Sequence, residues 1–201
     1  MRFLAIIFFA LISASAFAQV NESFVSVGWN TLKPLSDKDF TSGTSSAGMR
    51  IGYSKLLNEQ FGFGIEGGYN TLQDYVPRQT YEYPGGAVTT DMYNYLYYYT
   101  LMANAQYYFV QSKNFMPYAS VAMGVAFSEY RKYYNVYSDS DTKTSFAVRP
   151  EVGSIFKPKE YSTWGLKAAV SYEFAANKSD YFEVDNFSGI NFQVGLVLFM
   201  D

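Results

Sequence analysis

The stretch YNYLYYYTLMANAQYYF, residues 93–109, bears most directly on the fold because tyrosine crowds both of its ends while its middle is small and aliphatic. Alternate residues from Tyr93 to Phe109 fall on one face of an extended strand. Tyr99 and Tyr107 would lie about 20 Å apart in depth, at roughly 3.3 Å per residue and a tilt near 40°. Aromatic girdles border the apolar band of a transmembrane barrel, which is about 25 Å tall. The stretch therefore predicts a membrane-crossing strand; a tyrosine-rich strand of a soluble β protein is the alternative.

The same period-two alternation recurs along the chain, and no stretch keeps a helical period. The expected strands are Ser23–Trp29, Ser46–Leu56, Phe61–Asn70, Tyr93–Val110, Phe115–Ser128, Lys143–Phe156, Thr163–Phe174 and Ser188–Met200. Short connections (57–60, 111–114, 157–162) alternate with long ones (30–43, 71–92, 129–142, 175–187). This order predicts an all-β fold, an eight-stranded antiparallel up-and-down transmembrane β-barrel with both termini at the short-turn end.

Two residue sets follow from this arrangement. The apolar parity supplies a membrane girdle of Tyr99, Tyr107, Phe109 and Trp164. The opposite parity places six charged residues in the lumen: Arg50, Glu66, Arg149, Glu151, Lys167 and Glu173. A buried charge without a partner is costly, so we expect this set to form a network with the ion pairs Glu151–Lys167 and Arg50–Glu66.

The charged lumen has two interpretations. An eight-stranded barrel is just wide enough for side chains to fill, so the charges could be polar filling. They could instead line a narrow conduit for ions or small polar solutes. Pro150 tests the sixth strand, because proline cannot donate to a ladder; it predicts either a bulge or a local break there.

The N-terminus reads MRFLAIIFFALISASAFAQV, with one Arg, an apolar run and an A-x-A site. We interpret residues 1–18 as a secretory signal peptide and residues 19–201 as the barrel. A membrane anchor is the alternative, but the run is shorter than the roughly 20 residues of a spanning helix. Removing it leaves 14 Lys and Arg against 18 Asp and Glu, which argues against a nucleic-acid partner.

Cysteine and histidine are both absent from the sequence. Their absence removes disulfides, thiolate metal sites, the commonest metal ligand and the usual general base. We therefore predict no enzyme activity, no cofactor and no metal site. The long connections mix tyrosine with Asp, Asn and Ser, a composition typical of recognition surfaces, although solvated mobile loops would look the same.

Taken together, the chain resembles the small eight-stranded outer-membrane barrels of Gram-negative bacteria, the OmpA/OmpX-type outer membrane protein beta-barrel domain family. The resemblance rests on the signal peptide, the eight amphipathic strands, the charged lumen and the final strand INFQVGLVLFMD. It implies the cell outer membrane as location, outer-membrane lipid and lipopolysaccharide as surroundings, and the outer-membrane assembly machinery as partner. The sequence does not determine the oligomeric state, for which a monomer is the expectation. One departure is the ending Phe199-Met200-Asp201, where such barrels place a terminal aromatic; either this ending is tolerated or the last residues curl away.

Three functions remain open from the sequence. The first is an integral barrel with a structural or surface-interaction role through its extracellular loops. The second is a small porin-like conduit. The third is a soluble secreted lipocalin-like barrel, which would need an apolar interior and a polar exterior.

Overall fold

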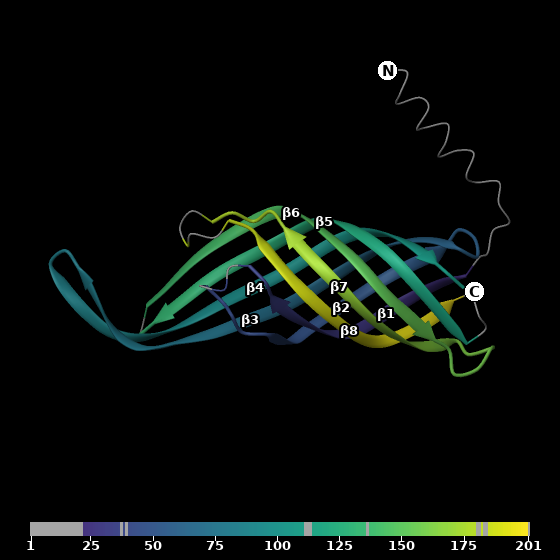
Figure 1. The fold of residues 1–201 in the computed structure, drawn as a ribbon, viewed down its shortest axis with the longest axis horizontal. Coiled ribbons are helices and arrows are strands. Elements are labelled where there is room, and N and C mark those ends of the chain that lie inside the picture. Colours follow the sequence, from purple (N-terminus) through teal and green to yellow (C-terminus); the bar gives the residue numbers. More distant parts are fainter. Residues whose placement is uncertain are drawn as a thin grey trace, which may run out of the picture.

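The computed structural model describes residues 22–36, 38, 40–110, 114–135, 137–179, 182 and 185–200. The predicted signal peptide, residues 1–18, lies outside this part of the chain. The strands are β1 (Ser23–Pro34), β2 (Ser45–Leu56), β3 (Phe61–Tyr83), β4 (Gly86–Tyr108), β5 (Phe115–Tyr134), β6 (Tyr137–Phe156), β7 (Trp164–Ala175) and β8 (Phe187–Met200). Each pairs with its neighbours in sequence, and β8 closes onto β1, so the predicted eight-stranded antiparallel barrel is confirmed (Figure 1).

Burial alternates with period two, but the polarity of the two faces is the reverse of that in a soluble barrel. Along β7, exposed and buried residues alternate at every position. The outward set is apolar, with Ile65 and Leu101 each 61% exposed, whereas the buried set includes the charged side chains. This inversion suits a barrel surrounded by lipid. No helix among the described residues is long and apolar enough to cross a membrane.

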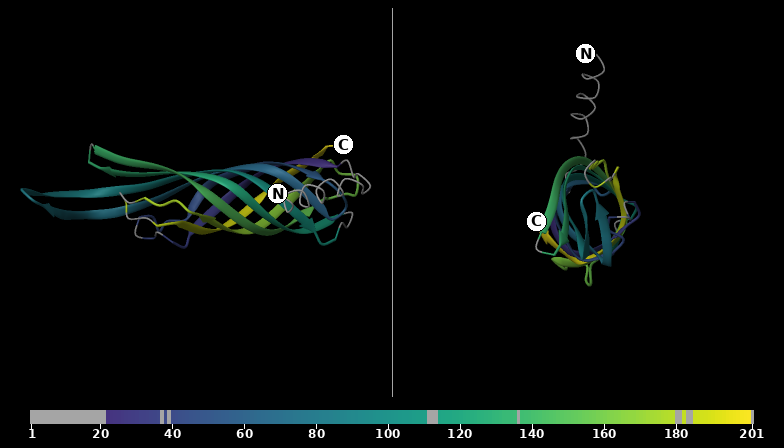
Figure 2. Two further views of the ribbon diagram at one scale, coloured as in Figure 1. Left: turned by 90° about the horizontal axis from the view of Figure 1, so that it is seen from above. Right: turned by 90° about the vertical axis from the view of Figure 1, so that its left-hand side faces the viewer.

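Four strands run well past the barrel ring, which corrects the sequence interpretation. The segments 71–92 and 129–142, expected as long loops, are the ends of two β-hairpins, β3–β4 and β5–β6. Figures 1 and 2 show these hairpins projecting beyond the other strands at the end opposite the short turns, β3–β4 the furthest. We call the part of β3–β6 beyond Tyr69 on β3, Tyr99 on β4, Phe127 on β5 and Thr144 on β6 the extension.

The hairpin tips explain why these segments pair. Pro84 and Gly85 alone connect β3 to β4, and Gly85 has a φ of 107°. Proline followed by glycine is the order that type II turns favour, because the second position needs a positive φ. At the other tip Asn135 has a φ of 53°, a conformation that asparagine tolerates better than most residues. Both turns return the chain directly onto itself.

Pro150 produces a local break and no bulge. On one side it is paired with Val121 of β5. On the other side the ladder to β7 is interrupted between Val148 and Glu151 and resumes in the same register. The strand therefore tolerates a missing donor without changing which side chains face the lumen.

The last strand continues to Met200, which pairs with Ser23 of β1. The final residues of β8 therefore do not curl away from the barrel. Phe199 turns inward against Phe24, with ring centroids 5.7 Å apart, and Lys157 Nζ lies 3.7 Å from the Phe199 ring centroid. Lys157 also pairs with Glu22 at 2.6 Å, so this cluster ties the β6–β7 turn to both ends of the sheet.

Candidate functional site

All six predicted lumenal charges are buried inside the barrel, at exposures of 7% or less. They come from β2 (Arg50), β3 (Glu66), β6 (Arg149, Glu151) and β7 (Lys167, Glu173). Three are positive and three are negative, so the layer that they form is neutral overall. Each of them has an ion-pair partner within the set.

Glu151 is the acceptor at the centre of one half of this layer. Its carboxylate lies 2.5 Å from Arg50 Nη1 and 3.1 Å from Lys167 Nζ. Tyr118 on β5 donates its hydroxyl to the same carboxylate at 2.6 Å. Arg50 also donates to Gln193 Oε1 at 3.1 Å, which brings in β8. One carboxylate thus holds side chains from three other strands.

Arg149 organises the other half. It forms an ion pair with Glu66 through Nη2 and lies 3.4 Å from Glu173 through Nη1. Glu173 also accepts from Asn191 Nδ2 at 2.6 Å. Asn191 in turn accepts from Asn30 at 3.2 Å, which continues the network to β1. Through these contacts the two halves join side chains from β1, β2, β3, β5, β6, β7 and β8.

Of the two predicted ion pairs, one is present, and the prediction of the other is wrong. The Glu151–Lys167 pair forms, although the backbone register places Lys167 opposite Ile155, so the lysine side chain reaches along the barrel to the carboxylate. Arg50 pairs with Glu151 instead of Glu66, and Glu66 pairs with Arg149. The error has a simple cause: hairpin counting considers only adjacent strands, whereas in a narrow barrel long side chains meet across the lumen.

Buried apolar side chains form a cluster on each side of the charge layer. Towards the extension lies a cluster of Leu32, Phe40, Leu72, Leu96, Tyr98, Met102, Ala122, Ala126, Tyr130, Ala147, Ala175 and Phe187. Towards the short turns lies a second cluster of Phe24, Leu56, Tyr108, Met116, Tyr118, Ile155, Ala169 and Val197. The charged layer therefore lies between two clusters of buried apolar residues.

The four predicted girdle residues all point outward from the barrel. Tyr99 is 46% exposed, Tyr107 36%, Phe109 56% and Trp164 44%. Tyr99 packs on Tyr69 of β3, with ring centroids 4.9 Å apart, and Tyr107 packs similarly on Phe61 at 5.1 Å. The two pairs border the aliphatic part of the wall from opposite ends.

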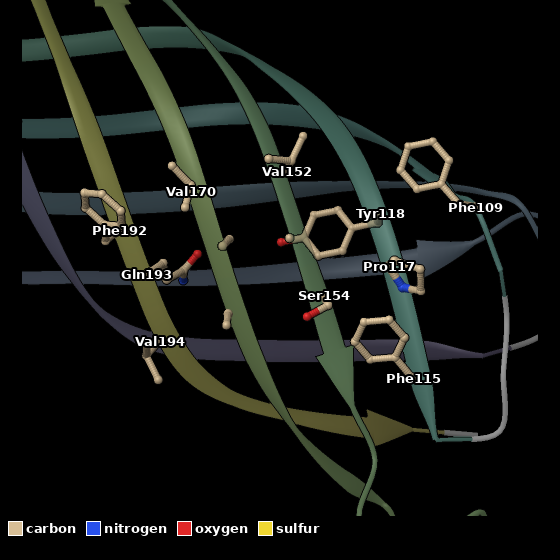
Figure 3. A pocket seen from close by; sticks show the side chains of 13 residues that line it. Phe109, Phe115, Pro117, Tyr118, Val152, Ser154, Val170, Phe192, Gln193 and Val194 are labelled. Carbon is tan, nitrogen blue, oxygen red and sulfur yellow. The ribbon is translucent and has the colours of Figure 1, made fainter.

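A shallow hollow of about 530 Å³ lies on the same outer wall near the short turns (Figure 3). Apolar side chains such as Phe115, Val152, Val170 and Phe192 surround the small residue Ala168 there. Charged residues are missing from its lining. The hollow is chemically part of the lipid-facing wall.

The sequence interpretation placed Tyr93, Tyr95 and Tyr97 on the outward face of their strand, as the structure has them, but it did not predict the hollow that they form with Tyr133. A hollow of about 380 Å³ is lined there by Tyr93, Tyr95, Tyr97 and Tyr133. Arg131 lies beside two of these rings, 6.0 Å from the Tyr97 centroid and 5.9 Å from that of Tyr133. Its guanidinium pairs with Glu129 and donates to the Tyr133 hydroxyl at 3.0 Å. Hydrogen bonding to Tyr133 and Glu129 raises the pKa of Arg131.

The β1–β2 connection is anchored to the extension by Asp74 on β3. Its carboxylate accepts from the backbone N–H of Ser42 at 2.8 Å and from the Ser42 hydroxyl at 2.6 Å. Burial tends to raise the pKa of Asp74, but these bonds and one from the Tyr75 N–H outweigh it and hold the pKa below its usual value. In the described ranges, no group of three or more acidic, His or Cys side chains could hold a metal ion.

A comparison with protein families identifies the family of this barrel. The family model for the outer membrane protein beta-barrel domain matches residues 4–198. The chain belongs to this family. Its place is therefore the cell outer membrane, as the resemblance implied. No curated protein matches the chain.

Solved structures share the fold of this family member at low sequence identity. The attachment invasion locus protein Ail of Yersinia pestis is 18% identical with a TM-score of 0.54, and the match covers 90% of this chain and 99% of Ail. OprG from Pseudomonas aeruginosa is 13% identical with a TM-score of 0.52, covering 90% and 97%. Neisserial surface protein A is 16% identical with a TM-score of 0.51, covering 88% and 95%.

The lipocalin-like alternative does not fit these findings. It needs an apolar interior and a polar exterior, whereas Arg50 and Arg149 are buried at the centre and Leu101 is exposed on the wall. The family of the chain is one of outer-membrane barrels.

Proposed function

We propose that this barrel has a structural or surface-interaction role, carried by the extension outside the membrane, and that its lumen does not conduct. The observation that carries the proposal is the enclosed charge layer. Its six charges are paired with one another, and apolar clusters pack on both sides of it. Opening a path through it would expose buried charges and break two packed layers, which costs several kcal/mol.

The proposal includes how the protein is exported and held in the outer membrane. Tyr99, Tyr107, Phe109 and Trp164 are the membrane girdle, because an amphipathic ring suits the boundary between lipid and water. Residues 1–18 direct export, and the assembly machinery of the outer membrane inserts a monomer among lipid and lipopolysaccharide. The sequence contains no histidine, the residue that most often serves as a general base. In this proposal the protein therefore acts without catalysis and without a cofactor.

A ligand at the surface is supported by the composition and reach of the extension. Tyrosine rings supply rigid, amphipathic contact area at a low cost in conformational entropy. A related structure of Ail, 14% identical to this chain, is a complex with the heparin analogue sucrose octasulfate. That identity is too low to transfer the ligand, so the case for a ligand here rests on the tyrosines of this chain.

A conduit remains the second candidate, because the neutral layer of charge crosses the whole lumen and could coordinate a passing ion. Planar-bilayer conductance separates the two. We expect refolded wild-type protein and Lys167→Ala to be silent, with insertion verified by heat-modifiable gel mobility. Lys143→Ala, which removes the same charge from the extension, is the matched control. Steady openings that Lys167→Ala alters and Lys143→Ala does not would replace our proposal with a conduit.

A further inference from the structure

The tyrosine hollow of the extension has a position that the membrane girdle does not explain. Tyr99 and Tyr69 belong to the girdle row, and the hollow begins two residues further along β4 at Tyr97 and ends at Tyr93. At about 3.3 Å per residue and a tilt near 40°, these rings stand roughly 5 to 15 Å above the girdle. This is the level of lipid headgroups and the layer outside them.

The hollow also has a direction. Tyr93, Tyr95 and Tyr97 share the outward parity of Leu101 on β4, while Asn94 and Leu96 between them are buried on the inner side. Tyr133 on β5 is paired with Tyr93 and continues the same face. The hollow thus opens sideways over the membrane surface and is continuous with the lipid-facing wall below it. A ligand seated there would lie beside the barrel among the headgroups.

The shape and chemistry of the hollow restrict what that ligand is. Tyr95 and Tyr97 present nearly parallel rings at 6.0 Å, and Tyr133 stands at 90° to Tyr95 at 5.7 Å. Its volume of about 380 Å³ is within the range of small-molecule sites. Aromatic faces carry negative electrostatic potential and attract weakly positive C–H groups, while the phenol hydroxyls donate and accept hydrogen bonds. A sugar ring offers both, a face of C–H groups and a rim of hydroxyls.

Charge argues for a neutral sugar over a phosphate. Arg131 is the one cation beside the rings among the described residues of this face, and Glu129 already pairs with it. Asp91 interacts with Tyr75 and lies outside the lining. The hollow therefore has no spare positive charge for a phosphate group.

From these observations we propose that the tyrosine hollow binds neutral sugar residues of the glycolipid in the outer leaflet, so that the extension is anchored in the saccharide layer around it. This inference rests on the proposed surface role and names its partner. Tyr95 is the central contact, since its ring packs against both Tyr97 and Tyr133.

The test uses the full barrel in nanodiscs of phospholipid mixed with either lipopolysaccharide that carries its core sugars or lipid A alone. Both probes share acyl chains and phosphates, so the core sugars make the difference. Tyrosine ring resonances, assigned by single Tyr→Phe substitutions, report occupancy. We expect the hollow's resonances to shift only with core-bearing lipopolysaccharide. In Tyr95→Ala the half-saturating mole fraction, read from Tyr133, should rise about tenfold, as truncating a central aromatic contact does.

Tyr161→Ala is the matched control, because Tyr161 is 90% exposed at a short turn on the opposite side of the membrane. It should leave the half-saturation point unchanged. Equal shifts with lipid A, no shift with either probe, or an unchanged response in Tyr95→Ala would each overturn the inference. Shifts with free core oligosaccharide but not with lipopolysaccharide would overturn the glycolipid source. A silent conductance record alongside any of these results would leave the broader proposal in place.

Discussion

The barrel wall and the extension are parts of the same strands, yet they face outward with different residues. On β4 the outward residues change from Leu101, Ala103 and Ala105 to Tyr93, Tyr95 and Tyr97 within a few positions, without a change of parity or register. The strand geometry is continuous, so we attribute the residue change to a change of surroundings from hydrocarbon to headgroups. The interiors differ as well, since the barrel encloses paired charges and the extension is an open sheet.

The largest effect on the free energy of unfolding is expected from a substitution in the lumenal charge network. Glu151→Gln keeps the shape of the side chain but leaves Arg50 and Lys167 facing a neutral amide in a buried layer. We expect a loss of about 3 to 5 kcal/mol in the free energy of unfolding, because one partner of a buried ion pair is removed. Urea titration of the refolded barrel in lipid vesicles measures this.

The matched change lies on the extension. Lys143→Ala removes a pair with Asp141 at 3.2 Å that is partly exposed. We expect about 0 to 1 kcal/mol there, as for other solvated pairs. Equal losses for the two variants would mean that the lumenal network contributes no more than a surface pair.

A smaller effect on stability is expected from placing arginine on the outward face, and it should differ between the barrel wall and the extension. Ala103, outward and midway between Tyr99 and Tyr107, should lie near the middle of the bilayer. Ala103→Arg should cost about 2 to 4 kcal/mol, the range for arginine on the lipid face at that depth. Gln73→Arg on the outward face of the extension should cost under about 1 kcal/mol. The same urea titration checks both, and similar costs would place residue 103 outside the hydrocarbon.

The smallest expected effect concerns the junction between the two regions. Because the folded pKa of Asp74 is lowered, its hydrogen bonds to Ser42 are fully present above the unfolded value, about 3.9, and are lost as pH falls through the lower folded value. We therefore expect the Ser42 amide resonance to be constant at neutral pH and to move only below about pH 4. Asp74→Asn should abolish this titration. A midpoint above about pH 5 would contradict the lowered pKa.

Several features of the site could be predicted from the sequence because they depend on local alternation. The lumenal position of Arg50 or Glu173 follows from period two alone, since it needs only the correct parity. The extension was predicted only in part: the expected strand Tyr93–Val110 already includes Tyr93, Tyr95 and Tyr97, whereas segments 71–92 and 129–142 were expected as loops although Pro84-Gly85 is a turn signal. Polar residues on both faces made those segments look like loops, because outside the membrane no apolar face is required.

The sequence by itself determined the class, the number of strands and the face on which each side chain lies. Only the tertiary structure decided that Arg50 meets Glu151 of β6 and that Glu66 meets Arg149, because these partners are far apart in the chain and meet only when the sheet closes. It also decided that four tyrosines from two strands form one hollow. Parity is a property of the strand, whereas contacts across a lumen or between strands depend on closure, stagger and register, which no single strand specifies.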